Sequence, residues 1–312
     1  MVARLRRRFA AWARPRRAEP LPVAIDRHRI YVLPTRFGLF FALLLAAMGL
    51  GALNYNNNPA LLLALLLAGV ANASLLAAHL QLSGLQVGAI GAEPVPAGTP
   101  LALRVQLRAD PARERRGLRV ERGEAWASVD LEDGAGVATL VLPTTRRGWL
   151  DPGRLRISTV RPLGIAVAWA YAWPEMPLLV YPAPETQGPP LPRHGDGAAA
   201  RLDPAGDDVH HLRAYRRGDP RRAIAWKPSA RRDQLLVREY EQPQGREVVL
   251  DWDALAPLDA EARIRRLARW VDEAERQGRR YRLQLPGQPA LGPDLGPRHR
   301  HACLRALALW PA

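Results

Sequence analysis

Two long apolar runs near the start of the chain dominate its hydrophobic pattern. The first covers Phe37 to Leu53 and the second covers Pro59 to Leu80, and neither contains an acidic residue, a lysine or an arginine. As an α-helix, each is long enough to cross a hydrocarbon core of roughly 30 Å. The polar residues Asn54 to Asn58 between them form a turn, so the pattern predicts a two-helix membrane hairpin. A signal peptide fits less well, because the second run follows at once; a buried helical pair in a soluble core is the other alternative.

The charges that flank the two runs predict how the hairpin is oriented. Ten arginines precede Phe37, whereas the turn after Leu53 carries no charge. By the positive-inside rule, both termini are expected in the cytoplasm and the asparagine-rich turn outside. We therefore expect two spans (residues 37–80) in the inner (cell) membrane of a bacterium. The basic leader, residues 1–36, would lie against anionic lipid, with a nucleic-acid-binding tail as the alternative.

The pattern changes to short alternating runs after the second span. Apolar and polar residues alternate with period two, and turn residues such as Asp133-Gly134 and Arg147-Gly148 separate the runs. This is typical of antiparallel strands, and we expect a β-sandwich-like domain over residues 81–184 that serves either as an interaction module or as a spacer. The predicted strands include Leu101–Leu107, Leu118–Val120, Val137–Leu142 and Leu155–Val160.

The rest of the chain predicts a linker and then an α/β unit. Residues 185–205 are rich in Pro, Gly and Ala, which favours a linker or long loop. Further on, a buried strand over Arg246 to Asp253 precedes a helix over Asp259 to Gln277, a strand over Arg280 to Leu285 and a helix over His299 to Trp310. This order implies a parallel strand pair. The expected buried face of the first helix consists of Ile264, Leu267, Ala268, Val271 and Ala274.

Composition and charge limit the classes of partner. The net charge is +15, with 45 basic residues of which Lys227 is the only lysine, and the mean hydropathy of −0.19 excludes a polytopic transporter. Such a charge suggests an anionic partner, either nucleic acid or anionic lipid head groups. The Ala-, Gly-, Pro- and Arg-rich composition is also typical of a GC-rich coding bias, which weakens the nucleic-acid interpretation.

The densest group of charged and aromatic residues lies between Gly206 and Glu241. It contains the sole lysine, and Leu235, Leu236, Val237 and Tyr240 indicate that the segment ends in a strand. Within it is a spaced pattern made of Arg213, Tyr215, Gly218, Asp219, Ile224, Trp226, Lys227, Ser229, Ala230 and Arg231, followed by Val237 and Glu239.

This pattern resembles the signature of the domain of unknown function family 58. The layout of a two-span hairpin, a strand-rich domain, the signature and an α/β unit is also similar to that family, although Ala214 stands where the family often has Glu. The resemblance implies a shortened von Willebrand factor A-like fold for residues 206–312 and a MoxR-type AAA+ ATPase as partner. It also implies an interaction surface at Arg213, Tyr215, Gly218, Asp219, Trp226, Lys227, Ser229 and Arg231, with a salt-bridged structural joint as the alternative.

The usual metal site of the von Willebrand A fold is degraded in this sequence. Its position corresponds to Asp251-Trp252-Asp253, where both serines of the usual pattern are missing. Hard cations need several oxygen ligands, so Asp251 and Asp253 are weak candidates, and capping of the next helix or pairing with arginine is the favoured interpretation. We expect no metal and no other cofactor.

The remaining reactive residues do not predict a catalytic site. His210 and His211 are adjacent and would point to opposite faces of a strand. Cys303, the only cysteine, follows His299 and His301 at helical positions that do not face each other, which favours a core thiol. No phosphate-binding loop, nucleophile elbow or HExxH motif is present.

Taken with the resemblance, these features predict a membrane-anchored scaffold or adaptor without enzymatic activity. It would assist a MoxR-type AAA+ ATPase in assembly or chaperone-like work. The alternative is a basic binder of nucleic acid or of anionic lipid head groups, although no nucleic acid is expected.

Overall fold

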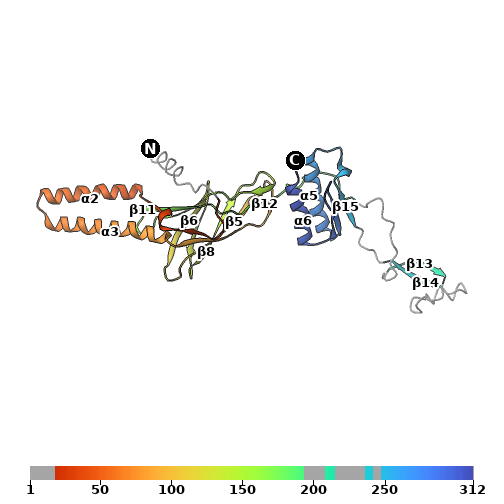
Figure 1. Cartoon of the computed structure of the whole chain (residues 1–312), viewed down its shortest axis with the longest axis horizontal. Helices are drawn as coiled ribbons and strands as arrows, with labels where there is room; N and C mark the ends of the chain where they lie inside the picture. Colours follow the sequence, from red (N-terminus) through yellow and green to blue (C-terminus); the bar gives the residue numbers. More distant parts are fainter. Residues whose placement is uncertain (1–17, 193–207, 215–235, 242–246, 312) are drawn as a thin grey trace. The chain divides into compact units, whose positions relative to one another are not determined.

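The computed structural model describes residues 18–192, 208–214, 236–241 and 247–311. The chain divides into two compact units, Met1–Tyr181 and Pro182–Ala312. Among the described residues, the first unit contains two long helices and most of the strands, and the second contains two shorter α-helices, a sheet of three short strands and a separate pair of strands (Figure 1).

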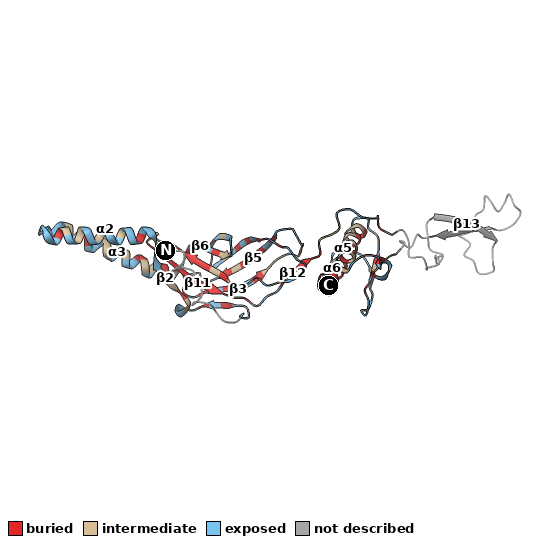
Figure 2. Cartoon of the chain, turned by 90° about the horizontal axis from the view of Figure 1, so that it is seen from above, coloured by how far each residue is buried: buried red, intermediate tan, exposed pale blue. Residues whose placement is uncertain are grey.

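The two apolar runs form the helices α2 (Arg36–Asn54) and α3 (Asn58–Leu82). Both are long and apolar enough to cross a membrane, and only 11% of the most hydrophobic stretch of each is buried. Most of their surface is exposed, whereas the strands beside them are largely buried (Figure 2). The predicted helical pair is therefore confirmed, and its apolar faces are not covered by the rest of the unit.

The region after α3 folds into mainly antiparallel sheets, as the alternating pattern predicts. One sheet has the strand order β1-β3-β5-β8 and a second has the order β2-β11-β10-β6-β7. A third, small sheet has the order β4-β12-β9, in which β4 and β12 pair in parallel. The strands are β1 (Val23–Ile25), β2 (Tyr31–Pro34), β3 (Leu85–Gly91), β4 (Val95–Pro96), β5 (Leu101–Arg108), β6 (Arg115–Arg122), β7 (Ala125–Leu131), β8 (Ala135–Leu142), β9 (Gly148–Leu150), β10 (Leu155–Thr159), β11 (Ala166–Ala172) and β12 (Leu178–Tyr181).

The two larger sheets share one hydrophobic core. In β5, Leu101, Leu103, Val105 and Leu107 are fully buried while the alternate residues are exposed or half-buried, which is the period-two burial of a sheet with one covered face. The same core contains residues of β10 and β11 from the other sheet, together with Ala78 and Leu82 from the end of α3. The core therefore extends from the sandwich to the last turns of the second helix.

The leader contributes two strands that the sequence did not predict. In this region β1 pairs with β3, and β2 pairs with β11, so residues assigned to a solvated leader lie in both large sheets. A short 3₁₀ helix, η1 (Arg27–Arg29), connects them. Because β2 runs into α2 and α3 runs into β3, the hairpin begins in one sheet and ends in the other.

The second unit contains the predicted parallel strand pair. Strand β15 (Val248–Asp251) pairs in parallel with β16 (Tyr281–Gln284), and the unpredicted β17 (Leu291–Asp294) pairs antiparallel with β16. A short 3₁₀ helix, η3 (Asp253–Leu255), and α5 (Ala260–Arg276) connect β15 to β16, and α6 (Pro297–Leu309) follows β17. The predicted buried face of α5 is confirmed and also includes Trp270.

Candidate functional site

Most of the predicted signature residues lie outside the described residues. These are Tyr215, Gly218, Asp219, Trp226, Lys227, Ser229 and Arg231. The two ends of the segment are described as an antiparallel pair of strands, β13 (Asp208–Ala214) and β14 (Leu236–Glu241). In this pair Arg213 stands opposite Val237, and Ala214 stands opposite Leu236. The signature segment therefore begins and ends at neighbouring positions of one hairpin, and the predicted exit through a strand is confirmed.

The paired strands also contain the two adjacent histidines. Val209 pairs with Tyr240 and His211 pairs with Glu239, so the register shifts at His210. This irregularity is a β-bulge, in which one strand carries an extra residue. The simple alternation assumed for His210 and His211 is thus interrupted at that point.

Asp251 ends β15 and makes a local turn contact with the residues that follow. Its Oδ1 atom accepts a hydrogen bond from the Asp253 backbone N–H at 3.0 Å, which is an Asx-turn. The N-cap residues of η3 and α5 are Trp252 and Asp259, and neither helix has a side-chain cap hydrogen bond, so the predicted capping by Asp251 or Asp253 is not observed. Among the residues that the structure describes, no group of three or more His, Cys, Asp or Glu side chains could hold a metal ion.

A cluster of titratable residues joins the two helices of the second unit. The Tyr281 hydroxyl donates a hydrogen bond to Glu275 at 2.9 Å, and the same carboxylate accepts one from the Gly296 N–H at the start of α6. The His299 ring packs on Tyr281 with ring centres 4.5 Å apart. Burial, and then the bond to Glu275, raises the pKa of the Tyr281 phenol. Glu275 therefore connects α5, β16 and α6.

His299 and Cys303 belong to this cluster, one helical turn apart. The Cys303 Sγ atom lies 3.6 Å from His299 Nε2, which also lies 3.0 Å from the Tyr281 carbonyl oxygen. Burial, with a smaller contribution from Glu275, raises the pKa of Cys303 to about 12. A nucleophilic cysteine needs the opposite shift, because the thiolate is the reactive form. The arrangement supports the prediction of a core thiol.

We predict that Cys303 in the native chain is nearly inert to thiol reagents at neutral pH. A pKa raised from 9.0 to about 12 leaves roughly a thousandfold less thiolate at a given pH. The rate of reaction with an aromatic disulfide, before and after unfolding in denaturant, tests this. A Val141→Cys variant provides an exposed thiol for comparison. If Cys303 and the thiol of the Val141→Cys variant react at equal rates in the native chain, the prediction is wrong.

The first residues of the second unit pack on α5. Arg266 donates two hydrogen bonds to Glu185, at 2.8 and 2.9 Å, and the Trp270 indole N–H donates to the Pro189 carbonyl at 3.2 Å. Leu191 is buried. The region predicted as a linker from residue 185 thus begins with residues that belong to the second unit.

We expect Glu185→Gln to destabilise the second unit by about 1 kcal/mol at neutral pH. The hydrogen bonds from Arg266 lower the pKa of the Glu185 carboxyl, and burial opposes that shift. A carboxyl pKa that is lower in the folded state adds stability above the unfolded-state pKa, and this stability is lost as the pH falls through the lowered pKa. Denaturant unfolding at neutral and acidic pH should show a difference that disappears in acid. Asp253→Asn is the control, and a pH-independent difference for Glu185→Gln would rule the explanation out.

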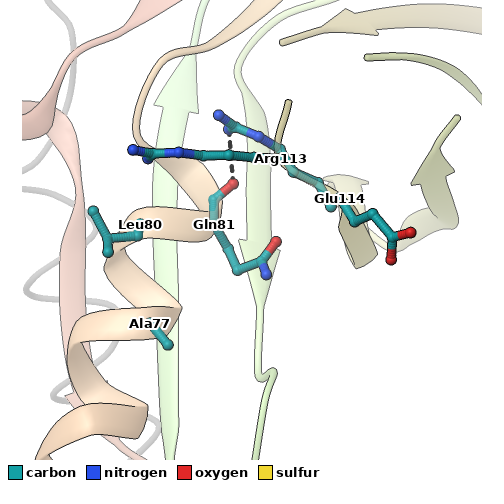
Figure 3. Close-up of a pocket in the computed structure, with 6 residues that line it drawn as sticks. Ala77, Leu80, Gln81, Arg113 and Glu114 are labelled. Atoms are coloured by element: carbon teal, nitrogen blue, oxygen red, sulfur yellow. Dashed lines mark hydrogen bonds between the residues drawn. The ribbon is translucent and has the colours of Figure 1, made fainter. Parts of the chain in front are cut away.

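A buried arginine connects the second span to the sandwich. Arg115, which is 2% exposed, donates hydrogen bonds to the carbonyl oxygens of Gln81 and Ser83 at 2.9 Å each. The dashed line in Figure 3 marks the bond to Gln81. These carbonyls lie at the C-terminal end of α3, where the helix leaves acceptors unpaired and favours a positive charge. Burial lowers the pKa of Arg115 from its usual value, and the nearby Arg113 adds to that shift.

The first span is connected to the sandwich through the turn between β10 and β11. The Thr35 hydroxyl donates to the Gly164 carbonyl at 2.6 Å and accepts from the Gly38 N–H at 3.0 Å, which caps α2. A side chain at Gly38 would place its Cβ 1.9 Å from the Ile165 carbonyl oxygen. The start of α2 therefore lies directly on this turn.

The outer face of the second sheet carries alternating aromatic and charged side chains. Tyr31 stacks on Trp169 with ring centres 5.7 Å apart, and Arg156 lies over Trp169. Arg156 pairs with Glu121 at 2.9 Å, and Arg119 lies 4.2 Å from the ring centre of Trp126. These contacts keep the aromatic rings and guanidinium groups of all five strands of this sheet in one layer.

The chain matches no protein-family model, no curated protein and no solved structure. Its function is therefore inferred from its residues and their geometry. Within the described residues, the most specific arrangement is the connection of two apolar helices to the two sheets of one sandwich. The sequence did not point to Arg115, Thr35 or Gly38, which make that connection.

Proposed function

We propose that this chain is a membrane-anchored scaffold without enzymatic activity, inserted through α2 and α3. The observation that carries the proposal is the position of the hairpin between β2 and β3, which belong to the two large sheets. Both helices join the sandwich without a flexible linker, and Arg115 and Thr35 hold their ends. An anchor of this kind restrains the sandwich at the bilayer surface, which suits a protein that positions a partner.

We further propose that the partner is a MoxR-type AAA+ ATPase on the cytoplasmic side. This proposal rests on the resemblance of the signature to the domain of unknown function family 58. The order β15, α5, β16 and α6, with a parallel strand pair and Asp251 at the end of β15, is compatible with a shortened von Willebrand A-like unit. The arginines before α2 support this proposal, because the positive-inside rule favours a cytoplasmic location for both termini and so for the signature.

In this proposal the signature residues form the docking surface. They are Arg213, Tyr215, Gly218, Asp219, Trp226, Lys227, Ser229 and Arg231. Strands β13 and β14 hold the two ends of the segment together.

A pull-down of the tagged full-length chain in mild detergent tests the partner. We expect mass spectrometry to identify an AAA+ ATPase with the wild type and to find it lost with Lys227→Ala/Arg231→Ala. An Arg104→Ala/Arg276→Ala variant removes two charges outside the signature and should retain the ATPase. Absence of an ATPase from the wild-type sample under gentle conditions, or loss from both variants, would contradict docking at the signature.

A further inference from the structure

Two exposed apolar side chains lie beside the first turn of α2. Val160 and Leu163, in the turn between β10 and β11, are each 50% exposed. The contacts of Thr35 with Gly164 and of Gly38 with Ile165 place this turn against the helix start. An apolar side chain left in water is less favourable than the same side chain in an apolar environment. Both residues are therefore at the level where the apolar surface of α2 begins.

A basic loop lies next to this turn, at the end of the other span. Gly117, which follows the loop between β5 and β6, approaches Arg161 so closely that a Cβ would lie 2.6 Å from its Nε atom. The Thr159 hydroxyl donates to the Gly117 carbonyl at 3.2 Å. The two loops thus form one continuous surface at the end of the sandwich from which the hairpin emerges.

The same loop forms a cavity with the last turns of α3. Figure 3 shows Ala77, Leu80 and Gln81 on the helix and Arg113 and Glu114 on the loop around this cavity of about 270 Å³. The buried Gln81 Oε1 and Arg115 Nε atoms at its edge have no hydrogen-bond partner. The cavity combines an apolar helix side with unpaired polar atoms and an arginine.

Positive charge predominates among the exposed side chains of this surface. Arg113, Arg116 and Arg161 are exposed. The nearby acids have local partners: Glu114 pairs with Arg116 at 3.0 Å, Asp110 accepts from the Ala112 N–H, and Asp130 accepts from the Gly117 N–H. An exposed surface that mixes arginines with apolar side chains suits the boundary between water and lipid.

We propose that this surface, the interfacial rim, is embedded in the lipid headgroup layer. The rim consists of Leu80, Arg113, Arg116, Val160, Arg161 and Leu163. Val160 and Leu163 enter the acyl boundary, and the arginines bind lipid phosphates, with a headgroup in the cavity beside Leu80. The proposal rests on the membrane anchoring proposed above and adds that the sandwich itself contacts the bilayer. Anionic lipid strengthens the contact, because its negative surface potential attracts basic residues near the membrane.

Fluorescent labelling of single cysteines in the full-length chain, in phosphatidylcholine nanodiscs, tests the rim. An environment-sensitive dye on Leu163→Cys should shift to the blue and be quenched by lipids that carry a spin label near the headgroup. Val141→Cys is the control, because Val141 is 60% exposed and lies far from the rim along the sheet. It pairs with Ala102 at the start of β5, whereas the end of β5, at Arg108, pairs with the start of β3, which α3 runs into. Cys303 is buried and should stay unlabelled.

A third label distinguishes failure of the rim from failure of the anchor. Leu65→Cys, on an exposed position of α3, should be quenched by lipids labelled deep in the acyl chain. If the dye at position 65 is quenched but those at 163 and 141 behave alike, the rim proposal is overturned while the anchor stands. If position 65 is not quenched, the anchor fails and the rim fails with it.

The contribution of the arginines has its own readout. Adding phosphatidylglycerol to the nanodiscs should increase quenching at Leu163→Cys, and Arg113→Gln/Arg116→Gln in the same background should abolish that increase. If phosphatidylglycerol still increases the quenching in the double variant, these arginines do not bind the lipid phosphates, and that part of the proposal is overturned.

Discussion

Arg115→Met is expected to destabilise the first unit by about 3 kcal/mol. The variant keeps an unbranched apolar stem but removes both hydrogen bonds to the last carbonyls of α3. The Gln81 and Ser83 oxygens would then lose their charged donor at a site from which water is largely excluded. Leaving buried acceptors unpaired accounts for most of the expected loss, and the absence of a positive charge at a helix C-terminus adds to it.

Denaturant unfolding of the full chain in detergent micelles, followed by tryptophan fluorescence, measures this change. The neighbouring Arg116→Met is a matched control, because Arg116 is exposed and pairs with Glu114 at the surface, and it should cost under about 0.5 kcal/mol. Hydrogen exchange should also increase in the last turn of α3 in the Arg115 variant. If the two variants are equally stable, Arg115 does not secure the helix end.

The long-range contacts of Arg115 explain why the sequence did not point to it. Leu118 and Val120 are buried at alternate positions. Regular alternation from these two residues would put Arg116 on the buried side of β6 and Arg115 on the exposed side. The structure has an irregularity between Arg115 and Leu118 that reverses this order. A β-bulge arises from pairing with a partner strand, which the local pattern does not contain.

The predicted strands were those with regular alternation. Leu101–Leu107 and Val137–Leu142 form β5 and β8, each with one buried face. By contrast, β11 is buried on both faces and consists largely of alanine, so polar and apolar residues do not alternate along it. The leader strands β1 and β2 are short, and they pair with strands far along the chain. Their stability comes from those tertiary contacts and not from local propensity.

The two apolar helices were predicted closely for the opposite reason. A run of apolar residues long enough for the bilayer needs no partner to be recognised, and α2 and α3 end within a few residues of the predicted limits. In the candidate cluster, the contact between His299 and Cys303 was not predicted. The alternating positions 299, 301 and 303 do not share a helix face, but residues 299 and 303 are four apart and therefore do. The role of Glu275 depends on Gly296 and Tyr281, which meet only in the folded unit.

Gly38→Ala is expected to destabilise the first unit by about 3 kcal/mol, although alanine is the better helix former. Its Cβ would lie 1.9 Å from the Ile165 carbonyl oxygen and 2.9 Å from the carbonyl carbon. These are backbone atoms, so the clash cannot be relieved by a change of rotamer. The helix must move away from the β10–β11 turn, and that movement also weakens the bond from Thr35 to Gly164.

Gly51→Ala in the same helix provides the control, because nothing lies within 4 Å of the Cβ it would add. On propensity alone it should be neutral or stabilise the helix by up to about 1 kcal/mol. Thermal unfolding in detergent should therefore move in opposite directions for the two substitutions, and hydrogen exchange at Thr35 to Leu39 should rise only with Gly38→Ala. A pair of alanine variants with the same stability would mean that the helix start can leave the turn at little cost. The sandwich would then be tethered to the spans without being held against them, and the apolar side chains of Val160 and Leu163 would have no defined depth.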